Sequence, residues 1–292
     1  MRVGVTIPAY ELATGKARSF AAMVEDAIAA ESLGYDSVWV MDHVFIERGG
    51  KRVVGGPEPL SFLSHVAART QEIELGTLVL CAPSRPPAQL ARELRTLQEA
   101  SGGRFILGIG AGWHQPEFDA FGFPFDHLVG RFEEYMEVLT RLLGGEGVDF
   151  EGRYQVLRRG VVYGDSAPLP WVAAAGPRML RLTGRLAGGW NGAWYGFDTS
   201  VFRERLVEVE AALQAEGRQR SELVASAGLL VLPGAPAQPS AIAGSPEQVA
   251  AAINAFGTAG CEHAILNFSL TPFAEGEPGL ARVLAPLLES MR

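Results

Sequence analysis

Two polar motifs in this 292-residue chain carry the side chains best suited to proton transfer. The first is Asp42-His43, which follows a short apolar run, and the second is Glu117. Histidine changes its charge near neutral pH, so His43 can hydrogen-bond to a bound ring or give a proton to a substrate. The alternative is a structural histidine tied to a loop carbonyl, and we expect Asp42 to orient His43 or the adjacent loop. Glu117 is the second catalytic candidate, with a solvent-facing position at the start of a loop as its alternative.

Glycines occupy alternate positions directly before a tryptophan, at Gly108, Gly110, Gly112 and Trp113. Side chains alternate across a strand, so these glycines leave one backbone face bare for a flat ring. Trp113 is then expected to cover the ring or to wall the substrate pocket. The alternative is a glycine-rich barrel corner with a core tryptophan. A dinucleotide fingerprint needs G-x-G-x-x-G running straight into a helix, and Trp113 followed by Pro116 argues against it.

A phosphate-binding turn is predicted where a run of small residues leads into a helix. Backbone N–H groups at a helix start can bind a phosphate, and a nearby arginine can add positive charge. The residues concerned are Ala174, Ala175, Gly176 and Arg178, and a plain strand-to-helix turn is the alternative. Trp190-Asn191 ends another short strand, where the amide can pair with the carbonyl and N–H groups of a ring.

The composition is that of a globular chain with a large core, because 48% of its residues are hydrophobic and 20% are charged. A net charge of −8 without a basic stripe argues against nucleic acid as a partner. No run approaches the ~18 to 20 apolar residues of a membrane helix, and the chain opens without a signal-peptide pattern. We therefore expect no membrane contact and a cytoplasmic location. The chain has only two cysteines, too few for a zinc site. His114 lies near Glu117, but no second histidine follows at helical spacing, so we expect no metal site.

Strand and helix patterns alternate from end to end, which predicts one α/β domain over residues 1–292. The expected strands are Val3–Ile7, Ser37–Val40, Ile73–Leu80, Arg104–Leu107, Trp171–Ala175, Gly189–Gly192, Val224–Leu232 and Cys261–Phe268. Eight such units without a long linker favour a (β/α)8 TIM barrel over a doubly wound open sheet. In a barrel the candidates above meet at the carboxyl ends of the strands.

Three other segments complete the predicted layout. Residues 144–170 interrupt the alternation and are interpreted as an insertion after the fourth strand–helix unit, with a hairpin near Val148–Leu157 and a strand near Gly160–Tyr163. Glu47–Pro59 is expected to be a polar, glycine-rich loop, and 278–291 the last helix.

Several segments together resemble one family, the bacterial-luciferase-like flavin and deazaflavin oxidoreductases. The matching segments are Ala30–His43, Leu75–Leu80, Ser101–Trp113 continuing to Arg131, Leu186–Asn191 and Gly244–Gln248. The resemblance implies a barrel that holds coenzyme F420, or FMN as the alternative, at its C-terminal mouth. It also implies a homodimer and a non-prolyl cis peptide at Leu78-Val79 in the third strand. That bulge would contact the ring, so Thr77, Leu78 and Val79 join the candidate cofactor-binding residues.

The resemblance implies an oxidoreductase that transfers hydride to or from a small organic substrate with coenzyme F420. An FMN-dependent monooxygenase is the near alternative, and a non-catalytic ligand-binding barrel is the second. Sugar-phosphate dehydrogenases of this family have a proton-donating glutamate at the position of Trp113, so their substrate is not implied here. The substrate itself would be selected by loops 44–59, 192–199 and 233–244.

Overall fold

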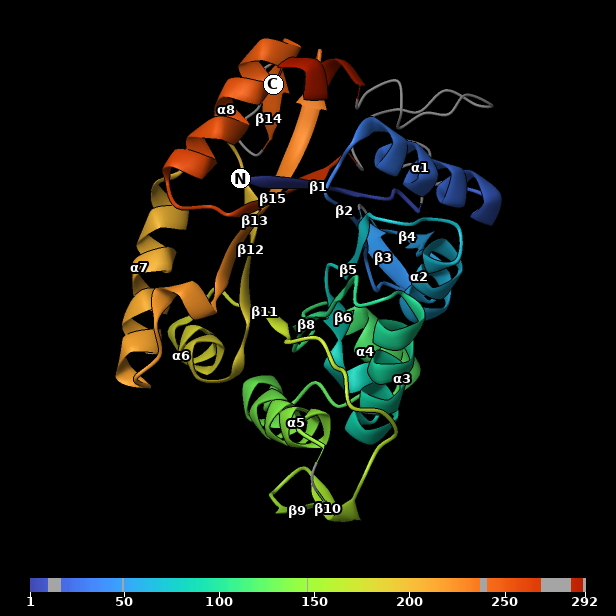
Figure 1. The fold of residues 1–292 in the computed structure, drawn as a ribbon, viewed down its shortest axis with the longest axis vertical. Coiled ribbons are helices and arrows are strands. Elements are labelled where there is room, and N and C mark those ends of the chain that lie inside the picture. Colours follow the sequence, from blue (N-terminus) through green and yellow to red (C-terminus); the bar gives the residue numbers. More distant parts are fainter. Residues whose placement is uncertain (10–16, 49, 146, 237–240, 269–284, 291–292) are drawn as a thin grey trace.

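The computed structural model describes residues 1–9, 17–48, 50–145, 147–236, 241–268 and 285–290. Within these ranges, parallel strands form a ring with the helices outside it (Figure 1). In ring order they are β1 (Arg2–Thr6), β2 (Ser37–Val40), β5 (Glu74–Thr77) with β6 (Leu80–Cys81), β7 (Phe105–Ile106) with β8 (Gly108–Gly110), β11 (Trp171–Ala173), β12 (Gly189–Tyr195), β13 (Val224–Pro233) and β15 (His263–Asn267). Strand β15 pairs with β1, which closes the ring and confirms the predicted TIM-barrel class.

The outer layer consists of helices that follow the ring strands. They are α1 (Phe20–Leu33), α2 (Pro59–Ala67), α3 (Pro87–Ala100), α4 (Gln115–Phe121), α5 (Leu128–Leu143), α6 (Pro177–Leu186), α7 (Ser200–Ala215) and α8 (Pro246–Thr258). Helix α8 begins with the predicted capping box, because Ser245 and Gln248 each accept a backbone N–H from the other. Residues 285–290 are helical, whereas the rest of the predicted last helix lies outside the described residues.

Two tryptophans fill part of the barrel interior. Trp39 and Trp171 are buried there with ring centroids 5.5 Å apart. Glycines on neighbouring strands make room for them: a Cβ on Gly76 would lie 2.2 Å from Trp39, and one on Gly189 would lie 2.3 Å from Trp171. The barrel interior is therefore a packed core at this level.

Residues 47–59 were expected to form a loop, and the structure corrects this interpretation. The chain from Phe45 to Val54 is an antiparallel hairpin of β3 (Phe45–Arg48) and β4 (Lys51–Val54). Its strands are rich in charged residues and mostly exposed, so they lack the apolar run by which buried strands are found.

A second antiparallel hairpin lies in the segment 144–170, apart from the ring. It consists of β9 (Val148–Glu151) and β10 (Val156–Gly160), and its turn is held by Glu134, which accepts the backbone N–H groups of residues 153–155. The separate strand expected at 160–163 was wrong, because β10 ends at Gly160.

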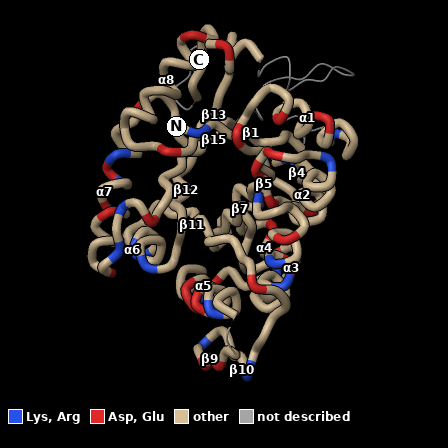
Figure 2. The backbone as a smooth tube through the Cα atoms, in the orientation of Figure 1, with Lys and Arg blue, Asp and Glu red and all other residues tan. Residues whose placement is uncertain are grey.

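Charged residues concentrate on the outer helices and hairpins, and both signs are interspersed there (Figure 2). No helix within the described ranges is long and apolar enough to cross a membrane. No cluster of three or more metal-ligating side chains occurs in that same part of the chain.

Candidate active site

The carboxyl ends of the ring strands bring the candidate residues to one mouth. His43 follows β2, the Leu78-Val79 bulge separates β5 from β6, Trp113 follows β8, and Gly176 follows β11. Because all ring strands are parallel, these positions lie on the same side of the barrel.

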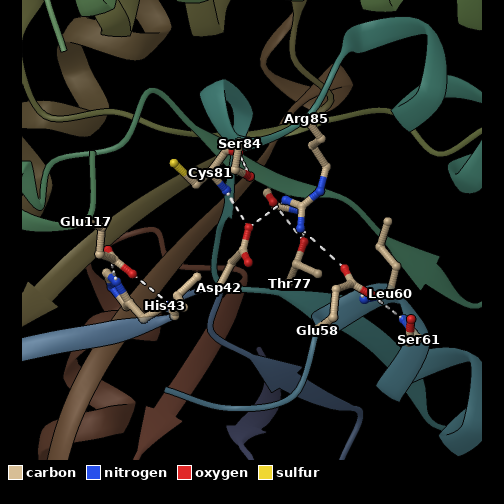
Figure 3. A network of polar contacts seen from close by, with 12 residues as sticks. Asp42, His43, Glu58, Leu60, Ser61, Thr77, Cys81, Ser84, Arg85 and Glu117 are labelled. Atoms are coloured by element: carbon tan, nitrogen blue, oxygen red, sulfur yellow. Dashed lines mark hydrogen bonds and ion pairs between the residues drawn. The ribbon is translucent and has the colours of Figure 1, made fainter. Parts of the chain in front are cut away.

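A hydrogen bond at this mouth joins His43 to Glu117. His43 Nδ1 lies 2.9 Å from Glu117 Oε2, while Glu117 Oε1 accepts the backbone N–H groups of Val44 at 2.7 Å and Phe45 at 3.2 Å (Figure 3). A carboxylate has no proton to give, so Nδ1 carries the proton and donates it. The other ring nitrogen, Nε2, is then available to a bound molecule.

Glu117 reaches His43 because residues 115–121 form a helix that the sequence did not predict. Pro116 lies in the first turn of α4, where a missing N–H costs nothing. Glu117 is 8% exposed, which rules out the solvent-facing alternative.

Asp42 orients the neighbouring loop, one of the two roles expected for it. Its Oδ2 accepts the N–H of Cys81 at 2.9 Å and pairs with Arg85 at 2.6 Å (Figure 3). Arg85 also contacts Glu58, whose carboxylate caps α2. These contacts tie the loops after β2 and β6 together.

Cys81 lies beside this network as a protonated thiol. Burial, together with the negative charges of Asp42 and Glu117, raises its pKa to about 12. The thiolate is the nucleophilic form of cysteine, so Cys81 is not a nucleophile at neutral pH.

The third strand contains the predicted non-prolyl cis peptide at Leu78-Val79. Thr77 just before it is fully buried, and its hydroxyl exchanges hydrogen bonds with both backbone groups of Gly108. The Thr77 hydroxyl is thus occupied between two strands, and a contact of this residue with a cofactor stays a prediction.

The glycine series is explained by close packing rather than by a bare face alone. A Cβ on Gly108 would lie 1.9 Å from the Thr77 carbonyl oxygen, and one on Gly110 would lie 3.0 Å from Val79. Gly112 has φ +85°, and a Cβ there would lie 2.3 Å from Phe118 of α4. Because these glycines have no side chain, they leave room for the bulge of the third strand and for the helix that carries Glu117.

Trp113 is 66% exposed, so it is not a core tryptophan. Its ring centroid lies 5.5 Å from that of His43, with the rings at 80°. This places an apolar surface directly beside the candidate catalytic imidazole.

Trp190 and Asn191 face opposite sides of β12, and only Asn191 remains a candidate. Trp190 is fully buried, stacks on Phe202 and donates its indole N–H to the carbonyl of Ala174, so its expected cofactor contact is corrected. Asn191 accepts a hydrogen bond from Ser226, and its buried Nδ2 has no partner.

Thr6 is a second buried polar group without a partner, and sequence reasoning missed it. Its register with Trp39 of β2, which lies in the barrel interior, places it on the inward face of β1. Its Oγ1 is buried and unpaired. Strand alternation in Val3–Ile7 is the signal that could have identified it. An unpaired amide donor and an unpaired hydroxyl fit a ring whose edge carries carbonyl and N–H groups, as flavins and deazaflavins do.

The predicted phosphate turn has an open helix start. Gly176 is the N-cap of α6 and offers no side-chain cap, and no atom lies within 4 Å of a Cβ built on it. Ala174 is buried and Ala175 is exposed beside this N-cap. The guanidinium of Arg178 pairs with Glu133, so part of the positive charge expected of it is already neutralised.

The fold and the mouth define a class, the flavin- and deazaflavin-type TIM-barrel oxidoreductases. Residues 1–236 match the family model described as luciferase-like monooxygenase. The chain belongs to this luciferase-like family, which confirms the resemblance predicted from sequence.

Curated relatives are about one third identical to this chain over the aligned residues. An F420-dependent glucose-6-phosphate dehydrogenase from Kineococcus radiotolerans is 34% identical over 231 residues, 76% of this chain and 65% of the relative. A phthiodiolone/phenolphthiodiolone dimycocerosates ketoreductase from Mycobacterium sp. (strain JLS) is 32% identical over 221 residues, 68% of this chain and 58% of the relative. The matches therefore span less than two thirds of these relatives.

Solved structures share the fold at lower identity. An F420-dependent secondary alcohol dehydrogenase in complex with an F420-acetone adduct has a TM-score of 0.83 at 18% identity, covering 100% of this chain and 99% of that one. EDTA monooxygenase from Chelativorans sp. BNC1 has a TM-score of 0.82 at 14% identity, covering 100% and 93%.

Proposed function

We propose that this chain is a coenzyme F420-dependent oxidoreductase that transfers hydride to or from a small organic substrate. The observation that carries the proposal is the His43–Glu117 pair at the barrel mouth. Relatives named as F420-dependent enzymes, 34% and 32% identical, support the choice of cofactor. The bound deazaflavin would supply or accept the hydride.

The chain's own residues would manage the proton and the binding. Glu117 holds the Nδ1 proton of His43, so His43 Nε2 can give a proton to a substrate carbonyl oxygen or take one from an alcohol. Asn191 Nδ2 and Thr6 Oγ1 would gain the partners they lack by binding the ring edge. Backbone N–H groups at the start of α6 would bind the phosphate.

Trp113 argues against assigning the relatives' substrate to this chain. It is the exposed apolar neighbour of His43, at the position where sugar-phosphate dehydrogenases of the family place a glutamate. The wall beside the imidazole therefore suits an apolar part of the substrate, and the proton at this site would come from His43.

An FMN-dependent monooxygenase is the second candidate, supported by the same fold in an FMN complex of a diketocamphane monooxygenase with a TM-score of 0.78. Separate titrations of the purified protein with coenzyme F420 and FMN distinguish the two. Tight binding of coenzyme F420 and weak binding of FMN supports the proposal, and the reverse result favours the monooxygenase.

The role of His43 is tested by His43→Ala. We expect turnover to fall roughly 100- to 10,000-fold, the usual contribution of a general acid or base. Affinity for coenzyme F420 should change less than about tenfold, because at most one hydrogen bond to the ring is lost. His65→Ala, at an exposed histidine of α2, is the control. Near-normal turnover in His43→Ala would make this histidine structural.

A further inference from the structure

Hairpin β3–β4 is attached to the active-site helix by two side chains, Glu117 and His114. Glu117 Oε1 accepts the N–H groups of Val44, directly before the hairpin, and of Phe45, its first residue. His114 Nε2 accepts the backbone N–H of Glu47 at 3.1 Å, in the middle of β3. The hairpin thus depends on acceptors that lie 67 to 73 residues away in sequence.

The contact made by His114 requires a neutral imidazole. Because Glu47 N–H is the donor, Nε2 must present a lone pair, and the ring proton is on Nδ1. A protonated imidazole has two donors and no acceptor, so Nε2–H would face the N–H of Glu47. His114 is 7% exposed, and Phe45 of the hairpin and Trp113 pack around its ring, which leaves little room for water to take over.

We propose that His114 is a positioning residue: the Nε2 lone pair of its imidazole holds the hairpin against α4 and keeps it at the wall beside His43. The proposal rests on the proposed function only in taking that wall to be part of the active site.

Release of the hairpin would change the substrate pocket and leave the proton-transfer group in place. Val44, at the base of the hairpin, and Trp113 are 53% and 66% exposed and flank His43. The bond from His43 to Glu117 Oε2 does not involve His114. We therefore expect substitution of His114 to raise KM more than it lowers kcat.

Amide hydrogen exchange of the hairpin tests the proposal without cofactor or substrate. Wild type, His114→Phe and His114→Gln are compared under the same conditions. Phenylalanine keeps an aromatic ring without an acceptor, whereas glutamine offers an acceptor. Protection in peptides covering 44–48 is corrected for intrinsic exchange, with hairpin β9–β10 as the internal control.

In His114→Phe, protection of 44–48 should be roughly two- to tenfold lower than in wild type, the range for loss of one hydrogen bond. Restored protection in His114→Gln would identify the acceptor as the cause. Wild-type protection in His114→Phe would overturn the proposal. Should coenzyme F420 fail to bind while the exchange result holds, the proposed function falls and the role of His114 stands.

Discussion

The two carboxylate oxygens of Glu117 accept hydrogen bonds from different groups, and one of these bonds fixes the tautomer of the candidate catalytic histidine. One oxygen fixes the Nδ1 proton of His43, and the other holds the chain directly after it. The sequence predicted both residues as candidates, but their contact spans 74 positions and depends on the unpredicted helix α4. Asn191 was predicted because a strand-end amide suits a ring edge, whereas its neighbour Trp190 was assigned wrongly because adjacent strand residues face opposite sides.

Glu117→Gln should change the tautomer of His43 while preserving the hairpin contacts. The glutamine oxygen can still accept the N–H groups of Val44 and Phe45, which turns its NH2 group toward His43 Nδ1. That nitrogen must then accept, so the proton moves to Nε2 and the neutral ring can no longer take a proton there. We expect turnover to fall roughly 100-fold or more.

Steady-state kinetics and nitrogen NMR of the histidine ring check this prediction together. Glu137→Gln, at a carboxylate of α5 that pairs with Arg141, is the matched control. Unchanged turnover in Glu117→Gln with a shifted tautomer would show that proton transfer at His43 does not limit the reaction.

At the scale of elements, apolar runs predicted the ring strands because strands buried on both faces are apolar throughout. The same reasoning could not find hairpin β3–β4, whose strands are mostly exposed and half charged. Two backbone N–H groups of β3 donate hydrogen bonds to Glu117 and His114, which lie far away in sequence. A local sequence pattern therefore does not indicate this hairpin. In the sequence, Pro116 indicates a loop after the strand, although proline is also common in the first turn of a helix.

Gly108→Ala tests whether the glycine series serves packing. Its Cβ would lie 1.9 Å from the Thr77 carbonyl oxygen, a backbone atom that cannot move without disturbing the third strand. We expect a loss of roughly 1 to 3 kcal/mol in the free energy of unfolding, the usual cost of overpacking. Gly176→Ala meets no atom within 4 Å and should stay within about 0.5 kcal/mol of wild type. Urea unfolding compares the two, and equal stabilities would contradict the packing explanation.

At the scale of the whole molecule, closure of the ring brings polar residues from distant segments into the barrel interior. His263 of β15 and Ser37 of β2 lie 2.7 Å apart there, beneath the tryptophan layer. The Ser37 oxygen also accepts the indole N–H of Trp39. His263 Nδ1 is buried and has no hydrogen-bond partner. A homodimer remains a prediction.

His263 should make the fold sensitive to acid. Burial first, and the charge of Arg2 second, lower its pKa from 6.5 to about 3. Between these two pKa values the histidine binds a proton in the unfolded chain but not in the folded chain. The free energy of unfolding therefore falls as the pH drops from 6.5 toward 3. From pH 6.5 to 5 this histidine should cost roughly 2 kcal/mol.

Urea unfolding of wild type and His263→Gln at pH 6.5 and 5 isolates this contribution. Glutamine does not titrate, and every carboxylate that responds to pH is the same in both proteins. The difference between the two pH slopes therefore belongs to His263, even if the variant is less stable at both pH values. We expect the slope of His263→Gln to be smaller by that ~2 kcal/mol over the interval. Equal slopes would contradict the prediction and mean that the imidazole is hydrated or protonated in the folded barrel, despite its edge-to-face contacts with Trp39 and Trp171.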